Sequence, residues 1–90
     1  MSPNEIAQLR KDIGLSQVDF GQLFGTHFMT VSKWERGITR PSPYQVALML
    51  QFRYTADLRK AEAQEQVKKL LVGAGVVAAL VWLLAKAGDT

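Results

Sequence analysis

Side chains that could carry out covalent chemistry are scarce in this chain. It contains one histidine, His27, and no cysteine, so there is no second imidazole or thiolate to share a metal ion or to activate a nucleophile. Most of its eight acidic residues have structural interpretations, such as first-turn positions in helices for Glu5 and Asp19. The sequence therefore predicts that the protein is not an enzyme, and that it has no catalytic residues, no metal site and no cofactor.

The length and composition describe one small domain with an added segment. Ninety residues bury a modest core, and the absence of cysteine excludes disulfides. Residues 1–11, MSPNEIAQLRK, lack the apolar stretch of a signal peptide, so we expect a cytoplasmic location for the domain. The net charge of +3 is compatible with a phosphate-rich partner but is too small to establish one.

The first part of the chain has the pattern of several short helices. Apolar spacing and the positions of Ser, Pro and Gly predict helices at about 3–13, 17–24, 28–36 and 43–52. Ser2 and Glu5 have the spacing of a capping box, and Gly25 opens a three-residue turn between the second and third helices. The residues expected in the core are Leu9, Ile13, Leu15, Phe20, Phe24, Val31, Trp34 and Ile38.

Residues 5–50 resemble the phage-repressor and Cro-like helix-turn-helix domain, also called the xenobiotic-response-element family. The matching stretches, in order, are Leu9-Arg10, Gly14-Leu15-Ser16-Gln17, Phe20-Gly21, Gly25, Thr30-Val31-Ser32-Lys33-Trp34-Glu35-Arg36-Gly37 and Arg40-Pro41-Ser42. The resemblance implies an all-α fold: a compact lambda-repressor-like domain of four to five helices, here with a long C-terminal helix that is apolar at its end. It also implies double-stranded DNA as the partner.

In this family the third helix is the recognition helix, whose N-terminal residues face base edges in the major groove. The base-contacting positions implied here are His27, Phe28, Met29, Ser32 and Lys33. Lys33 can donate to guanine, whereas Phe28 and Met29 have no polar atoms and depart from the polar residues that are commoner there. Two interpretations of this pair stay open: contact with thymine methyl groups, or an apolar surface that binds protein.

Other positions are expected to bind phosphate or to brace the fold. The resemblance implies phosphate contacts from Gln17 and from a second group, Thr30, Thr39 and Arg40. Arg10 and Glu35 commonly form an internal salt bridge in this family, so we expect Arg10 to be structural rather than to contact DNA. Gly21 occupies a position where the family usually has alanine, which predicts a close approach between the second and third helices.

The composition changes after residue 54. We expect three parts: a DNA-binding domain at 1–54, a solvated helical connector at 55–69, and an apolar helix at 70–87. The apolar helix contains LLVGAGVVAALVWLLA, residues 70–85, in which the indole of Trp82 is the one side chain that can form a hydrogen bond. Such a run needs cover from lipid or from protein.

Both kinds of cover remain open from the sequence. Sixteen apolar residues extend about 24 Å as a helix, slightly less than a bilayer core of about 30 Å, so the run could anchor the protein in the inner membrane. Alternatively it forms the core of a homodimer or higher homo-oligomer. Small-residue packing occurs in both settings, so the residues of interest are the same: Gly73, Gly75, Ala78, Ala79 and Trp82.

The sequence thus predicts a sequence-specific DNA-binding transcriptional regulator from a bacterium or a mobile element such as a phage. We expect a repressor or autoregulator that binds a palindromic operator as a dimer. The alternative is a membrane-tethered adaptor whose helix-turn-helix domain binds protein through Phe28 and Met29, an analogy at the level of fold. The domain would be cytoplasmic in either case, soluble or anchored to the inner membrane.

Overall fold

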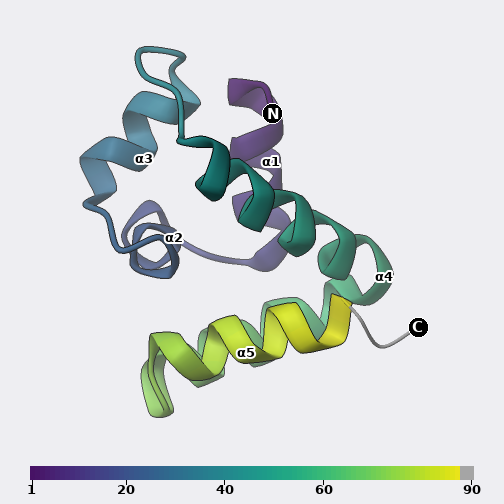
Figure 1. The fold of residues 1–90 in the computed structure, drawn as a ribbon. Helices are drawn as coiled ribbons and strands as arrows, with labels where there is room; N and C mark the ends of the chain where they lie inside the picture. Colours follow the sequence, from purple (N-terminus) through teal and green to yellow (C-terminus); the bar gives the residue numbers. More distant parts are fainter. Residues whose placement is uncertain (88–90) are drawn as a thin grey trace.

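The computed structural model describes residues 1–87, which form five α-helices (Figure 1). The helices are α1 (Pro3–Ile13), α2 (Gln17–Leu23), α3 (Phe28–Glu35), α4 (Pro43–Gly73) and α5 (Val76–Ala87). The predicted all-α fold is confirmed. Helices α1 to α3 and the first half of α4 form one layer of the molecule, and α5 lies beneath it, alongside the second half of α4 (Figure 1).

Polar caps fix the ends of the first helices. The Ser2 hydroxyl accepts a hydrogen bond from the Glu5 amide at 3.1 Å, and the Glu5 carboxylate accepts one from the Ser2 amide at 2.8 Å. Gly14 ends α1 with a φ of 82°, a left-handed conformation that side chains with a Cβ rarely adopt. A second capping box begins α4 at Ser42. The predicted starts of α1 and α4 therefore agree with the structure.

The core lies among α1, α2, α3 and α4, and α5 adds Ala79 and Leu83 to it. Of the eight residues expected there, six are at most 4% exposed: Leu9, Ile13, Leu15, Phe20, Val31 and Trp34. Phe24 is partly buried, with its ring 5.6 to 5.8 Å from those of Phe52 and Trp34. The prediction was wrong for Ile38, which is 58% exposed because it lies in the loop after α3, where helical spacing does not apply.

Helix α4 is much longer than the sequence predicted. It was expected to end at about Phe52, yet it continues to Gly73 and has one residue with non-helical backbone angles, Arg59. Residues 55–69 were expected to form a solvated helical connector. They are helical, as part of α4, but Ala63 and Val67 are fully buried because α5 packs against this part of the helix.

The apolar segment is not one continuous helix with the residues before it. The chain reverses at Ala74 and Gly75, where Gly75 has a φ of 99°, and α5 returns along α4 as a helical hairpin (Figure 1). Ala79 and Leu83 are buried on the inner side of α5, and the buried hydroxyl of Thr55 donates to the Leu83 carbonyl at 2.7 Å. The expected long helix with an apolar end is therefore corrected to two packed helices.

Charged side chains join α1 to α4 near Arg59, where α4 is kinked. Asp12 accepts a hydrogen bond from Arg53 at 2.8 Å and lies 3.4 Å from the ammonium of Lys60. Arg53 also pairs with Asp57 at 2.7 Å. This network clamps the end of α1 to both sides of Arg59. Among the helices of residues 1–87, none combines the length and the apolar composition that a membrane crossing requires.

Candidate nucleic-acid interface

Helix α3 separates its side chains into an inner and an outer face. Val31 and Trp34 point into the core and are at most 2% exposed. At 100° per residue, the opposite arc of the helix carries Phe28, Met29, Ser32, Lys33 and Arg36. Phe28 and Met29 are 43% and 51% exposed, and Lys33 is also exposed. The outer arc therefore presents two apolar and two cationic side chains to solvent from one short helix.

His27 organises the start of this face. Its Nδ1 atom caps α3 by accepting a hydrogen bond from the Met29 amide at 3.3 Å, which leaves Nε2 for a contact outside the protein. The imidazole also packs on the ring of Phe28, with centroids 4.5 Å apart. The cap and the ring contact hold His27 and Phe28 together at the N-terminal end of the outer face.

Ser32 and Arg36 form a linked pair one turn apart. Nε of Arg36 donates to the Ser32 hydroxyl at 3.1 Å and to the Ser32 carbonyl at 3.3 Å. The Ser32 hydroxyl, predicted to contact a base, is thus already held by a neighbour. Arg36 was not among the predicted base contacts, although its spacing of seven from Met29 places it on the same face.

An ion pair fixes α3 against α1. Arg10 donates to both carboxylate oxygens of Glu35, at 2.7 and 3.0 Å, and also to the Leu15 carbonyl at 3.0 Å. Gln17, the first residue of α2, donates to the same carboxylate at 3.3 Å. Burial alone would raise the pKa of Glu35, but the hydrogen bonds from Arg10 and Gln17 outweigh burial, and the pKa is lowered. Glu35 is therefore an anionic joint among three helices.

The turn between α2 and α3 depends on a residue without a side chain. A Cβ on Gly21 would lie 2.7 Å from the Thr26 carbonyl oxygen, and the Gly21 carbonyl accepts a hydrogen bond from the Thr26 amide at 2.9 Å. The predicted close approach is thus made by the turn itself. The same added Cβ would lie 3.5 Å from Cγ2 of Val31 in α3, an ordinary contact distance. Two short helices joined by a tight turn, with the second anchored from behind and free on its outer face, form a helix-turn-helix unit.

Comparison with known proteins agrees with this geometry. Residues 6–52, more than half of the chain, match the family described as Helix-turn-helix. The chain belongs to this family. It is of the phage-repressor and Cro-like type, and it is a DNA-binding regulator of transcription. No curated protein and no solved structure matches the chain.

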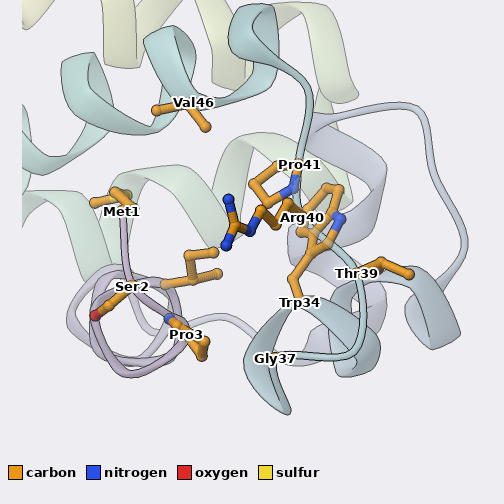
Figure 2. Close-up of a pocket in the computed structure, with 10 residues that line it drawn as sticks. Met1, Ser2, Pro3, Trp34, Gly37, Thr39, Arg40, Pro41 and Val46 are labelled. Carbon is orange, nitrogen blue, oxygen red and sulfur yellow. The ribbon is translucent and has the colours of Figure 1, made fainter.

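The loop after α3 extends the exposed surface of this helix-turn-helix domain. Thr39 and Arg40 are exposed, whereas Thr30 is half-buried on the flank of α3. Arg40 forms no ion pair with the side chains that the structure describes. Figure 2 shows it extending across a pocket of about 400 Å³ between α1, α3 and α4, which is lined by 10 residues including Trp34 and Ser2. The Arg40 guanidinium is therefore available to an anion.

The residues expected to mediate packing of the C-terminal helix do not share one surface. Ala79 is fully buried within the chain, Trp82 is half-buried against the core, Ala78 is half-buried, and Gly75 lies in the turn of the hairpin. Of this set, Gly73 alone is exposed. The large exposed side chains of the helix-turn-helix protein in this region are instead Val72, Val77, Val81 and Leu84.

Proposed function

We propose that this protein is a sequence-specific DNA-binding repressor or autoregulator, which binds a palindromic operator as a dimer with α3 in the major groove. The observation that carries the proposal is the exposed outer arc of α3, held rigidly by Val31, Trp34 and the Arg10–Glu35 pair. A recognition helix needs this combination, because base readout requires a side-chain array that does not move relative to the phosphate contacts.

Each exposed residue of α3 has a contact that suits its chemistry. Lys33 and Arg36 can donate to guanine O6 and N7, which are paired acceptors in the major groove. Phe28 and Met29 can contact only thymine methyl groups, so we expect at least one thymine in each half-site. Nε2 of His27 can donate to a base or to the adjacent phosphate.

Phosphate contacts position this array without reading sequence. The exposed residues of the loop, Thr39 and Arg40, lie directly after α3 and suit one strand of the DNA backbone. Thr30 can add a hydroxyl contact from the flank of the helix. The amide of Gln17 is engaged by Glu35, so we assign it first to bracing α3 and second to a phosphate at the N-terminus of α2.

Occupancy of an operator explains repression without any further activity. Two copies on half-sites about one DNA turn apart would cover some 20 base pairs and exclude other proteins from that stretch. The family match supports DNA binding and regulation, and the repressor role and the dimer are the specific parts of the proposal. If the operator overlaps the promoter of its own gene, the protein limits its own synthesis.

Selection from a random pool of DNA duplexes with the 90-residue protein tests the proposal directly. We expect an enriched palindrome that contains thymine in each half-site, and an affinity for it that falls steeply with salt concentration because phosphate neutralisation releases counterions. Fluorescence anisotropy between about 50 and 200 mM salt measures this slope. No binding at the lowest salt concentration would contradict the proposal and favour the protein-binding adaptor.

Two variants separate reading from positioning. Lys33→Ala should weaken binding roughly 5- to 100-fold and relax the preference at one base pair, as expected for loss of a base contact. Arg40→Ala should weaken binding to all sequences alike and reduce the salt slope by about 1. Lys68→Ala removes the same charge from α4, far from α3 in the sequence, and is the matched control. Equal loss of affinity in all three variants would mean that only net charge matters.

A further inference from the structure

The hairpin leaves an apolar surface uncovered on the outer side of α5. Val77, Val81 and Leu84 follow one another at spacings of four and three, so they lie on one face of the helix, which we call the α5 face. They are 73%, 59% and 40% exposed. Val72, in the last turn of α4, is 84% exposed at the same end of the hairpin as Val77. No polar side chain separates these residues.

We propose that the α5 face is the surface through which two copies of this chain pair around a two-fold axis. The proposal deepens the proposed function, since it names the contact that joins the two DNA-binding units. The small residues Gly75 and Ala79 lie outside the contact, because Gly75 forms the turn and Ala79 is fully buried inside the chain.

The distribution of charge favours a second copy as the occupant. Residues 70–85 contain no charged side chain, although the chain as a whole carries a net charge of +3. An anionic partner would need cations on the α5 face, and Val77, Val81 and Leu84 carry no charge. A second α5 face is equally neutral and apolar, so two copies can meet there without opposing like charges.

The position of α5 suits a dimer that binds DNA. Helix α2 packs against α3 on one side and against α5 on the other, so it separates α3 from α5 (Figure 1). A two-fold axis beside the α5 face therefore places the two copies of α3 on the outer parts of the dimer. Each must lie about 17 Å from the axis to reach successive major grooves about 34 Å apart. That distance fits within a molecule of 33 × 26 × 21 Å.

The size of the surface predicts a weak dimer. The four exposed side chains form a patch on the order of a few hundred Å² per copy, which is the scale at which apolar patches mark interaction sites. Pairing two such patches gives an interface below about 1,200 Å², at the low end of specific contacts. We expect a dissociation constant in the micromolar range, with the palindromic site favouring the paired state.

Sedimentation velocity of the full chain tests the surface, with a matched pair of variants. We expect the wild type to dimerise at micromolar concentration, and Val81→Asp to raise the dissociation constant at least tenfold. Leu50→Asp is the control, because Leu50 is 54% exposed and lies in the first half of α4 rather than on α5. Circular dichroism should show that both variants remain helical, since neither residue is buried.

Cysteine cross-linking gives a second readout that does not depend on loss of stability. The chain has no cysteine, so Val81→Cys introduces a single thiol at the centre of the α5 face, where a residue meets its own copy across the axis. Mild oxidation should yield a covalent dimer from Val81→Cys and much less from Leu50→Cys. The reverse pattern, or a Val81→Asp variant as dimeric as the wild type, would overturn the proposal.

Two further outcomes separate this proposal from its neighbours. A wild type that stays monomeric but co-sediments with vesicles of phosphatidylethanolamine and phosphatidylglycerol would show that lipid covers the α5 face, and would overturn the proposal. A wild type that dimerises through Val81 but binds no DNA would support the dimer surface and contradict the proposed function. Binding of Val81→Asp to single half-sites, with loss of preference for the palindrome, supports both.

Discussion

The exposed face of α3 and the exposed face of α5 differ in what accompanies their apolar side chains. On α3, Phe28 and Met29 share the surface with Lys33, Arg36 and the capping imidazole of His27. On α5, the large exposed side chains among those that the structure describes are Val77, Val81 and Leu84. The mixture of cations and apolar groups suits the major groove, where phosphates, base edges and methyl groups lie together. The uniform surface suits another apolar surface. The two faces therefore indicate two different kinds of partner in one small protein.

The two regions also differ in how they are held in place. The helix-turn-helix unit relies on directional contacts: the Arg10–Glu35 pair, the helix caps and the close turn at Gly21. The hairpin is held mainly by burial of aliphatic side chains, and Thr55 supplies its one buried hydrogen bond from a side chain among those that the structure describes. We therefore expect the replacement of a single polar residue to destabilise the helix-turn-helix unit more than the hairpin.

The largest effect is expected for Arg10→Ala. It leaves the Glu35 carboxylate, whose side chain is 9% exposed, without its cationic partner. The free energy of unfolding should fall by roughly 2–4 kcal/mol, because removing one partner of a mostly buried ion pair leaves the other charge unpaired and poorly solvated. Urea denaturation measures the loss. Arg36→Ala is the control: its guanidinium is exposed and, within the part of the chain that the structure describes, it bonds only to Ser32, so we expect a change of about 0.5 kcal/mol or less.

A different result for Arg10 would break the comparison. If Arg10→Ala kept the stability of the wild type but lost DNA binding, Arg10 would be a DNA contact and the brace between α1 and α3 would be of little importance. If Arg36→Ala were the more destabilising change, the outer face of α3 would be part of the scaffold rather than a free surface.

Much of the helix-turn-helix unit could be predicted because its signals are local. Ser2 with Glu5 and Ser42 with Gln45 are caps that can be read over four residues, and Gly14 ends its helix in the conformation expected of glycine. Arg10 and Glu35 are 25 residues apart and have no local signal; the family resemblance alone suggested their contact, and the structure places them 2.7 Å apart.

The errors arose where the sequence pattern fits more than one structure. The small residues around Gly75 were interpreted as a helix-packing surface, although glycine beside alanine serves equally well in the turn of a helical hairpin. Residues 55–69 have a polar composition, and its few buried residues, Thr55, Ala56, Ala63 and Val67, do not stand out in it. The pairing of Arg36 with Ser32 at the C-terminal end of α3 was not predicted.

The second-largest effect is expected at a glycine. Gly21 in the helix-turn-helix unit can be compared with Gly73 in the hairpin, because both lie in helices. Gly21→Ala should destabilise the protein by about 1–3 kcal/mol, because the added Cβ meets a backbone oxygen that cannot move aside. Gly73→Ala is the matched change in the hairpin, where the Cβ has no atom within 4 Å. It should be neutral or stabilising by up to about 1 kcal/mol, since alanine reduces the entropy of the unfolded chain. Thermal denaturation of both variants measures the difference, and equal melting temperatures would contradict the tight turn.

Thr55→Val tests the hairpin itself and should have a smaller effect. Valine has nearly the same shape as threonine but cannot donate to the Leu83 carbonyl, so the loss should be about 1–2 kcal/mol. Amide exchange in α5 should increase more than in α1. Thr39→Val, in the exposed loop, is the control for stability and should change it by no more than about 0.5 kcal/mol. Uniform acceleration of exchange would mean that the hairpin and the helix-turn-helix unit unfold together.

The smallest expected effect is that of mild acid on the free energy of unfolding. It acts through two carboxylates, those of Asp12 and Glu35. Burial by itself would raise the pKa of Asp12, but hydrogen bonds from Arg53, Gln8 and Lys60 outweigh it and lower the pKa, as happens at Glu35. A carboxylate with a lowered pKa stabilises the folded state above its unfolded pKa, and that contribution is lost as the pH falls through the folded value. The ordinary values are 3.8 and 4.5, so stability should be level above about pH 5 and decline below pH 4.5.

The two joints can be separated by removing one titration at a time. Glu35→Gln removes the group that titrates within the helix-turn-helix unit, and Asp12→Asn removes the one that ties α1 to α4. Each variant should be less stable than the wild type at pH 7. Each should also lose less stability between pH 5 and pH 3, because it lacks one carboxylate that takes up a proton when the wild type unfolds in acid. Measured by urea denaturation at each pH, coincident curves for wild type and Asp12→Asn would show that the clamp between α1 and α4 contributes nothing. The comparison would then rest on the Arg10–Glu35 joint alone.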